Sequence, residues 1–210
     1  MTEKVDLENK GAKKSPETTE VSGSFGLVIK PDAETERKAL SLAGEMAPNA
    51  EFQIKVPHIT LYHGRVNNLP LPMVKDLLLR LRKHRGESLV LNSLKVYGGK
   101  FLFWNNEKTG SLRSMHQEAL KLAEYLARDT VSRAAEEGLD MTPEELENVK
   151  KYGHPLVMER YTPHITLAYD SQGLTLPPSG NIEPWEMKID DVLFSEMGKY
   201  GVVARVVDLQ

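Results

Sequence analysis

The pentapeptide PHITL occurs twice in this chain, at residues 57–61 and again at residues 163–167. β-Branched and aromatic residues surround both copies, which predicts that each copy lies on a β-strand. Side chains alternate between the two faces of a strand, so each copy presents a histidine and a threonine on one face and turns its isoleucine and leucine toward a core. The copies lie about half a chain apart, which suits two related halves of one fold better than tandem repeats. We therefore expect the two motifs to face each other.

Four polar side chains of the repeat form the candidate site. His58 and His164 supply imidazoles, and Thr60 and Thr166 supply hydroxyls. A neutral imidazole can take a proton from a nucleophile, an imidazolium can give one to a leaving oxygen, and hydroxyls can donate to phosphate oxygens. This combination can cleave a phosphodiester without a metal ion. The less favoured interpretation is a chance coincidence between two core strands.

The rest of the sequence predicts the strands and helices of an α+β protein. Expected strands cover residues 24–30, 52–63, 88–96, 100–104, 161–169, 185–196 and 201–208, and expected helices cover residues 33–47, 71–84, 111–136 and 140–151. Pro57 has no N–H to donate, which favours an edge position or an irregularity in the first motif strand. Thr142, Pro143 and Glu145 have the pattern of a helix start with a capping box.

Glycine-containing segments and a polar N-terminal stretch set the expected boundaries. Hairpin turns are expected at residues 98–99 and 198–200. Residues 1–22 mix charges of both signs with small residues and show no apolar periodicity, so they predict a flexible tail. Residues 23–210 are then expected to form a single bilobal domain.

Composition excludes several classes of protein. The chain has 210 residues, no cysteine and a formal net charge of −3, with an isoelectric point near 6.1. The absence of cysteine excludes disulfides and thiol nucleophiles, and the charge argues against binding to long duplex nucleic acid. The sequence shows no apolar run of membrane-spanning length and no signal peptide, so we expect a cytoplasmic protein that is not bound to a membrane. A monomer that binds a nucleotide or a short oligonucleotide is the expected state.

The other charged and histidine-containing segments give no support to rival chemistries. The remaining histidines show no His-Glu-x-x-His spacing, so we expect neither a metal site nor a cofactor. The Gly-Lys pairs lack the spacing of a phosphate-binding loop, which removes support for ATP hydrolysis. The basic run at residues 80–85 is typical of the solvated end of a helix.

The two motif copies, extended in the second case to Pro163-His164-Ile165-Thr166-Leu167-Ala168-Tyr169, resemble the paired His-x-Thr/Ser signatures of the two-histidine phosphoesterase superfamily. This superfamily includes RNA 2′,3′-cyclic phosphodiesterases that are often labelled 2′-5′ RNA ligases. The resemblance covers the layout from about residue 24 to residue 209, with a closing hairpin at residues 187–194 and 201–207.

The resemblance implies a bilobal, pseudo-two-fold α+β fold in which antiparallel sheets line a central groove and helices lie outside. It also implies metal-independent hydrolysis of nucleotide phosphodiesters, with His58 and His164 as the acid–base pair and with Thr60 and Thr166 binding phosphate. Family substrates include 2′,3′-cyclic ends, 2′-5′ linkages, ADP-ribose cyclic phosphates and cyclic oligonucleotides. The alternatives are a nucleotide-binding module without catalysis and an RNA 2′-5′ ligase that uses the same residues.

Two aromatic residues are candidates for substrate contacts. Trp104 lies at the end of an expected strand beside polar Asn105, so its indole can stack on a base, although core packing is the simpler interpretation. Strand alternation places Tyr62 on the face of His58 and Thr60. The same alternation places Tyr169 on the opposite face from the second motif, so it is not expected to contact a ligand.

Overall fold

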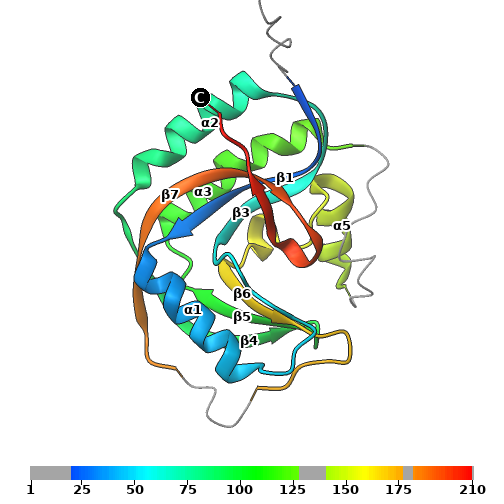
Figure 1. Cartoon of the computed structure of the whole chain (residues 1–210). Helices are drawn as coiled ribbons and strands as arrows, with labels where there is room; N and C mark the ends of the chain where they lie inside the picture. The colour runs from blue at the N-terminus through cyan, green and yellow to red at the C-terminus, as the bar shows by residue number, and fades with distance from the viewer. Residues whose placement is uncertain (1–19, 128–140, 177–181, 210) are drawn as a thin grey trace, which may run out of the picture.

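The computed structural model describes residues 20–127, 141–176 and 182–209, and its elements are shown in Figure 1. The strands are β1 (Glu20–Pro31), β2 (Phe52–Gln53), β3 (Ile59–Pro70), β4 (Ser88–Tyr97), β5 (Phe101–Asn106), β6 (His164–Tyr169), β7 (Trp185–Met197) and β8 (Val203–Val206). The α-helices are α1 (Ala33–Met46), α2 (Leu71–Leu81), α3 (Gly110–Ala119) and α5 (Pro143–Tyr152). Short 3-10 helices are η1 (Arg82–His84), η2 (Leu120–Tyr125), η3 (Met158–Arg160) and η4 (Lys199–Gly201).

The strands form one connected, entirely antiparallel sheet. Its order is β1-β3-β6-β5-β4-β7-β8, with β2 beside β6 and a further pairing between β1 and β7. The pairings therefore run in a closed circuit through β1, β3, β6, β5, β4 and β7. In Figure 1 the first half, with β1 and β3, lies above the second half, with β4, β5 and β6, and the long β7 curves past both. The expected α+β fold with antiparallel strands is confirmed, although the two halves belong to a single sheet.

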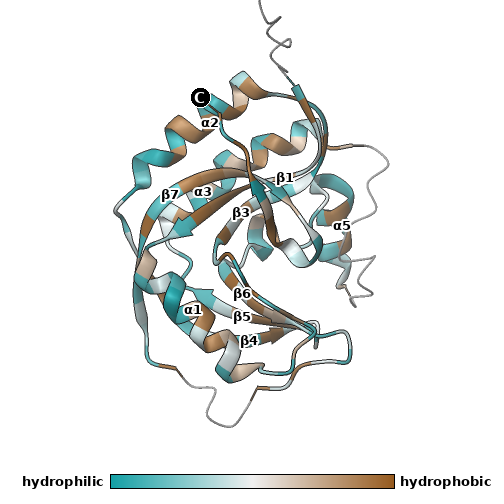
Figure 2. Cartoon of the chain, in the orientation of Figure 1, coloured by the Kyte–Doolittle hydropathy of each residue, from teal (hydrophilic) through white to brown (hydrophobic). Residues whose placement is uncertain are grey.

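Amphipathic helices cover the two halves. Helices α2 and α3 pack against β3, and α2 also packs against β7, whereas α1 packs against β6 and β7. The buried stripe of α2 consists of Val74, Leu77, Leu78 and Leu81, which recur at helical spacing. Figure 2 shows the same two-sided pattern along the helices, with hydrophilic and hydrophobic residues on opposite sides. The helices thus seal one face of the sheet and leave its motif-bearing face to the site.

Some element bounds differ from the predictions. Strand β1 begins at Glu20, so residues 20–22 belong to a strand and not to the expected tail, whose residues 1–19 lie outside the described residues. The first motif strand is interrupted, because β2 ends at Gln53 and β3 begins only at Ile59. Pro57 lies in this interruption, as its missing N–H predicts.

Of the other predicted boundaries, the start of α5 is confirmed, whereas the long helix and the last strand differ from the prediction. The capping box of α5 is present, with Thr142 and Glu145 bonded reciprocally. The expected helix at residues 111–136 changes to a 3-10 helix after Ala119, and its residues 128–136 lie outside the described residues. The last strand is confined to β8, because η4 occupies the start of the range expected for it. None of the helices in the described part of the chain is long and apolar enough to cross a membrane.

Candidate active site

The two motif copies meet where the two halves of the sheet join. Strand β3 pairs with β6 through Ile59 and Ile165, the central residues of the two pentapeptides. Because the strands are antiparallel, the residue that follows one isoleucine lies beside the residue that precedes the other. Thr60 is therefore next to His164, and the same geometry places the other histidine next to the other threonine. We call His58, Thr60, His164 and Thr166 the motif junction.

The two histidines are held in the same way. Nδ1 of His58 lies 2.8 Å from the carbonyl oxygen of Val56, and Nδ1 of His164 lies 2.6 Å from that of Thr162. In both cases the acceptor is two residues earlier, on the far side of the motif proline. A proton on Nδ1 satisfies this bond, which orients Nε2 of the neutral ring as the proton acceptor. Each copy of the motif thus builds the same half-site.

The two rings differ in their surroundings. Nε2 of His58 lies 3.0 Å from the carbonyl oxygen of Gly201, and the side chain is buried, with 5% exposure. His164 is only half-buried, and Nε2 of His164 has no hydrogen-bond partner among the described residues. The ring of His164 stacks on Phe103, with 3.5 Å between the ring centroids. The half-site of the second motif is therefore the more accessible of the two.

Burial keeps both histidines in their neutral form. The pKa of His164 is lowered to about 4, mainly by desolvation; the bond to the Thr162 carbonyl opposes this effect, and the nearby His58 adds to it. Desolvation also lowers the pKa of His58, against the opposing effect of the Val56 and Gly201 carbonyls. Two adjacent neutral imidazoles are ready to accept protons, and an anion bound between them would favour protonation of either ring.

A β-bulge follows the threonine in each copy of the motif. On β3, Thr60 and Tyr62 pair with the consecutive residues Val28 and Leu27, which leaves Leu61 as an extra residue. On β6, Thr166 and Ala168 pair with Phe103 and Leu102, which leaves Leu167 as an extra residue. A bulge reverses the alternation of side chains beyond it. Residues after each bulge therefore point to the face opposite to the one that simple alternation predicts.

The structure corrects the predictions for three aromatic residues, two of which, Tyr62 and Tyr169, follow the bulges. Tyr62 is buried in the core and donates to the carbonyl of Tyr152 over 2.7 Å, so it does not lie on the face of the motif junction. Trp104 is fully buried in the same core. The structure thus contradicts the interpretation of both as substrate contacts. Tyr169, which alternation excluded, lies instead on the face of Thr166, where it stacks on Tyr200 and contacts Phe101 with its ring tilted.

Two buried rings hold the first bulge in place, and the motif pattern did not predict them. His116 of α3 accepts the N–H of Met158 on one ring nitrogen, and its other ring nitrogen lies 2.6 Å from the Leu61 carbonyl. Tyr161 stacks on His116 and donates to the Thr60 carbonyl over 3.3 Å. These contacts tie the first motif to the segment that leads into the second. Only the tertiary structure brings them together, because α3 is remote from both motifs in the sequence.

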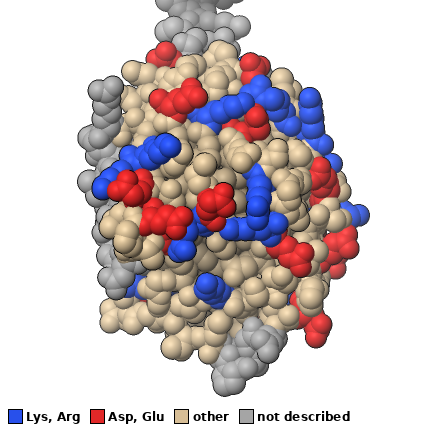
Figure 3. Space-filling view, turned by 180° about the vertical axis from the view of Figure 1, so that it is seen from behind, with Lys and Arg blue, Asp and Glu red and all other residues tan. Residues whose placement is uncertain are grey.

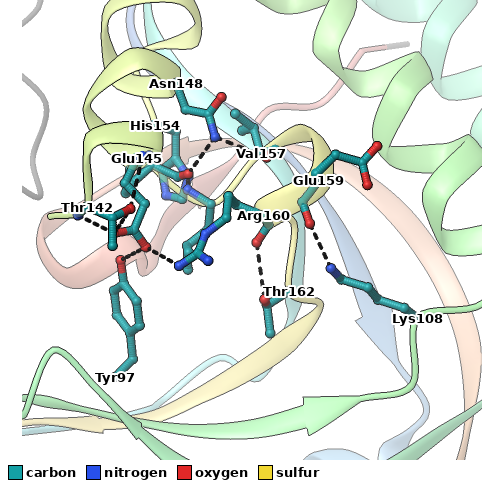
Figure 4. A network of polar contacts seen from close by, with 12 residues as sticks. Tyr97, Lys108, Thr142, Glu145, Asn148, His154, Val157, Glu159, Arg160 and Thr162 are labelled. Atoms are coloured by element: carbon teal, nitrogen blue, oxygen red, sulfur yellow. Dashed lines mark hydrogen bonds and ion pairs between the residues drawn. The ribbon is translucent and has the colours of Figure 1, made fainter.

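A buried carboxylate anchors the segment before the second motif (Figure 4). Glu145 of α5 is 3% exposed and accepts from the Thr142 backbone, from the hydroxyl of Tyr97 and from the guanidinium of Arg160, the last over 3.0 Å. Desolvation acts to raise the pKa of Glu145, but these donors outweigh it and hold the pKa below its usual value. The network fastens α5 and Arg160 to the β4–β5 hairpin.

We expect Glu145→Ala to lower the free energy of unfolding by about 2 kcal/mol, because it removes part of a capping box and leaves the Tyr97 hydroxyl and the Arg160 guanidinium without this acceptor. Chemical denaturation measures this loss. The matched control is Glu147→Ala on the same helix, whose ion pair with Lys150 is exposed, so the expected loss is within about 0.5 kcal/mol. Equal losses in the two variants would show that the buried network does not stabilise the fold.

Several charged side chains of the basic run at residues 80–85 pair with acidic residues. In the basic run, Arg82 pairs with Asp191 over 3.0 Å and Arg80 pairs with Glu118 over 3.1 Å. Figure 3 shows the same mixture of positive and negative side chains over the face turned away from the view of Figure 1. This supports the interpretation of the run as a solvated helix end. The described residues contain no group of three or more His, Asp or Glu residues placed to hold a metal ion.

Comparison with solved structures identifies the fold. Escherichia coli LigT in complex with NADP+ superposes with a TM-score of 0.52 at 14% identity, over 90% of this chain and 95% of LigT. The chain has the fold of LigT. A structure described as a phosphoesterase superposes on this chain with a TM-score of 0.53 at 14% identity, over 90% of this chain and 97% of that one.

A protein of Thermus thermophilus superposes on this chain with a TM-score of 0.55 at 18% identity, over 88% of this chain and 95% of that one. No family model and no curated protein sequence matches the chain. LigT has also been solved with 3′-AMP, with phosphate and with ATP. At these identities the LigT-like architecture is shared, and the chemistry has to be argued from the motif junction itself.

Proposed function

We propose that this protein is a metal-independent phosphodiesterase that hydrolyses phosphodiesters of nucleotides or short oligonucleotides, with His58 and His164 as its acid–base pair. The Ile59–Ile165 pairing carries the proposal, because it joins two equivalent histidine half-sites. A site that only binds phosphate needs hydrogen-bond donors, whereas a matched pair of imidazoles also allows proton transfer at both ends of a displacement.

The surroundings of the two rings suggest their roles. Nε2 of His164 has no hydrogen-bond partner among the described residues, and its neutral form is favoured, which suits the base that removes a proton from the attacking water. His58 is then assigned the role of the protonated acid, with its Nδ1 hydrogen-bonded to the Val56 carbonyl. In hydrolysis the water oxygen bonds to phosphorus, the ester P–O bond breaks, and His58 gives its proton to the leaving oxygen.

The threonine hydroxyls complete the proposed site. Thr60 and Thr166 are half-buried beside the two histidines, and neither hydroxyl is hydrogen-bonded within the described part of the chain. A hydroxyl in this position can donate to a non-bridging phosphate oxygen, where negative charge increases during displacement. Nucleotide substrates are supported by the LigT complexes with 3′-AMP and NADP+, which share the fold. The 2′,3′-cyclic, 2′-5′ and cyclic oligonucleotide linkages are the substrates to test.

The test is a chromatographic turnover panel of 2′,3′-cyclic mononucleotides, 2′-5′ oligoadenylate and cyclic di- and trinucleotides, assayed in EDTA. We expect the wild-type protein to cleave at least one member and the His58→Ala/His164→Ala variant to cleave none. Turnover that disappears in EDTA would contradict metal independence. Tight binding without product would favour the nucleotide-binding module, and joining of RNA ends without hydrolysis would favour the ligase.

A further inference from the structure

The tip of the β7–β8 hairpin, residues 198–202, reaches from one half of the sheet to the other. Tyr200 at this tip stacks on Tyr169 of β6, with 4.1 Å between the ring centroids and 21° between the ring planes. Its ring also lies 5.6 Å from that of Phe52 in β2, and its hydroxyl donates to Glu51 over 2.8 Å. Both the ring and the hydroxyl of Tyr200 therefore fasten the tip to the second half.

The same tip covers the first histidine. The carbonyl oxygen of Gly201 lies 3.0 Å from Nε2 of His58, the nitrogen that the proposed reaction needs. The two histidines are anchored alike, yet His58 is buried and His164 is only half-buried. A substrate oxygen cannot approach Nε2 of His58 while this carbonyl occupies its position. The carbonyl stands where the leaving oxygen of a substrate would accept the proton.

A substrate oxygen can replace the Gly201 carbonyl at Nε2 of His58 for a chemical reason. Both ring nitrogens of His58 face carbonyl oxygens, those of Val56 and Gly201. A neutral imidazole carries one N–H, so one of the two carbonyls always faces a nitrogen lone pair. Because burial favours the neutral ring, the Gly201 contact is weaker than an ordinary hydrogen bond. An incoming hydroxyl or ester oxygen can therefore compete with it.

The tip is also built to move as a unit. Backbone bonds within it, from Gly198 to the Val202 carbonyl and from Val202 to the Lys199 carbonyl, hold its shape independently of the sheet. Tyr200 has φ 58° and ψ 21°, a left-handed conformation that is unfavourable for a tyrosine. Three of the four residues of β8 are exposed. Segments with so little buried surface open more readily than a core strand.

We propose that residues 198–202 form a cap that closes over His58 in the free protein and that substrate must displace, with Tyr200 as its latch. The cap controls access to the proposed active site, so its biological role rests on the proposed function. Whether the cap exists can be tested without measuring turnover, because the cap determines how exposed His58 is in the unliganded protein.

The experiment is carbethoxylation of the histidines of the unliganded full-length protein with diethylpyrocarbonate, followed by tandem mass spectrometry of each histidine site. We expect His58 in the wild-type protein to react on the order of 10-fold more slowly than His164. Tyr200→Asn removes the ring and keeps a residue that tolerates the left-handed conformation, so it should speed the reaction at His58 about fivefold or more. His84, which lies outside the site, is the surface reference.

Tyr200→Phe is the matched control, since it keeps the stacked ring and loses only the bond to Glu51. We expect it to speed the reaction at His58 by about twofold, less than Tyr200→Asn. The proposal of a cap would be wrong if His58 and His164 of the wild-type protein were carbethoxylated at equal rates. It would also be wrong if Tyr200→Asn left the carbethoxylation rate of His58 unchanged. A rise at buried His116 as large as at His58 would also overturn it, because this would indicate general unfolding. A silent turnover panel would contradict the proposed function and leave these rates unaffected.

Discussion

His58→Ala and His164→Ala should each lower turnover on the true substrate by on the order of 10²–10⁴-fold, the usual range for loss of a general acid or base. Each histidine contributes one proton transfer to the same displacement, so neither can replace the other. The double variant should be about as inactive as the slower single variant, because residues that act as a unit are not additive. Single-turnover assays with saturating substrate measure the loss in the chemical step.

His58→Asn and His164→Asn separate chemistry from structure. The asparagine amide can keep the hydrogen bond to the carbonyl of Val56 or Thr162 that Nδ1 makes in each half-site. It has no atom at the position of Nε2, so it cannot transfer the proton. We expect both variants to fold with wild-type circular dichroism and to be as inactive as the alanine variants. If either keeps more than about a tenth of wild-type turnover, the paired acid–base mechanism is wrong.

The four residues of the motif junction could be found from the sequence because the information is local. An identical pentapeptide on two strand-like segments identifies His58, Thr60, His164 and Thr166 without knowledge of the fold, and the structure brings the two copies together through their central isoleucines. The α2 stripe and the α5 capping box were predictable for the same reason, since both depend on residues within a few positions of each other.

The aromatic residues around the site were not predictable from alternation. A bulge adds one residue to one strand of a pair, and its position depends on the partner strand. Leu61 and Leu167 are unpaired because of their neighbours in β1 and β5. The consequence is that Tyr62 turns into the core and Tyr169 turns toward the site. The equivalent position of the two bulges shows that the repeat extends to backbone geometry as well as to sequence.

The contacts that distinguish the two histidines are longer in range still. Gly201 is remote from His58 in the sequence, and nothing in the turn at residues 198–202 indicates which side chain its carbonyl meets. His116 lies on a helix whose apolar stripe predicts burial, but not the carbonyl to which it bonds. Such contacts depend on how the two halves pack. It is therefore easier to predict from the sequence which residues form the candidate site than to predict which parts of the chain cover them.

The free energy of unfolding should fall as the pH drops from about 6.5 to about 4. His164 makes the contribution whose magnitude can be given. Its pKa is lowered from 6.5 to about 4 in the folded protein. Between these values the unfolded chain binds a proton that the folded chain does not, so the free energy of unfolding rises with pH and is lost as the pH falls. His58 and His116 act in the same direction, because burial lowers their pKa as well.

The expected loss from His164 alone is about 3 kcal/mol over the whole window. The buried carboxylate of Glu145 also loses stabilisation in acid, but only as it becomes protonated at pH values below 4.5, the ordinary pKa of a glutamate side chain. Urea unfolding at pH 7.0, 6.0 and 5.0 therefore isolates the histidines from the carboxylates. His164→Asn removes the titrating ring and keeps the backbone hydrogen bond, so its stability should depend less steeply on pH over this interval. A free energy of unfolding that stays constant between pH 7.0 and 5.0, or an equal slope in His164→Asn, would show that His164 is not held neutral by burial.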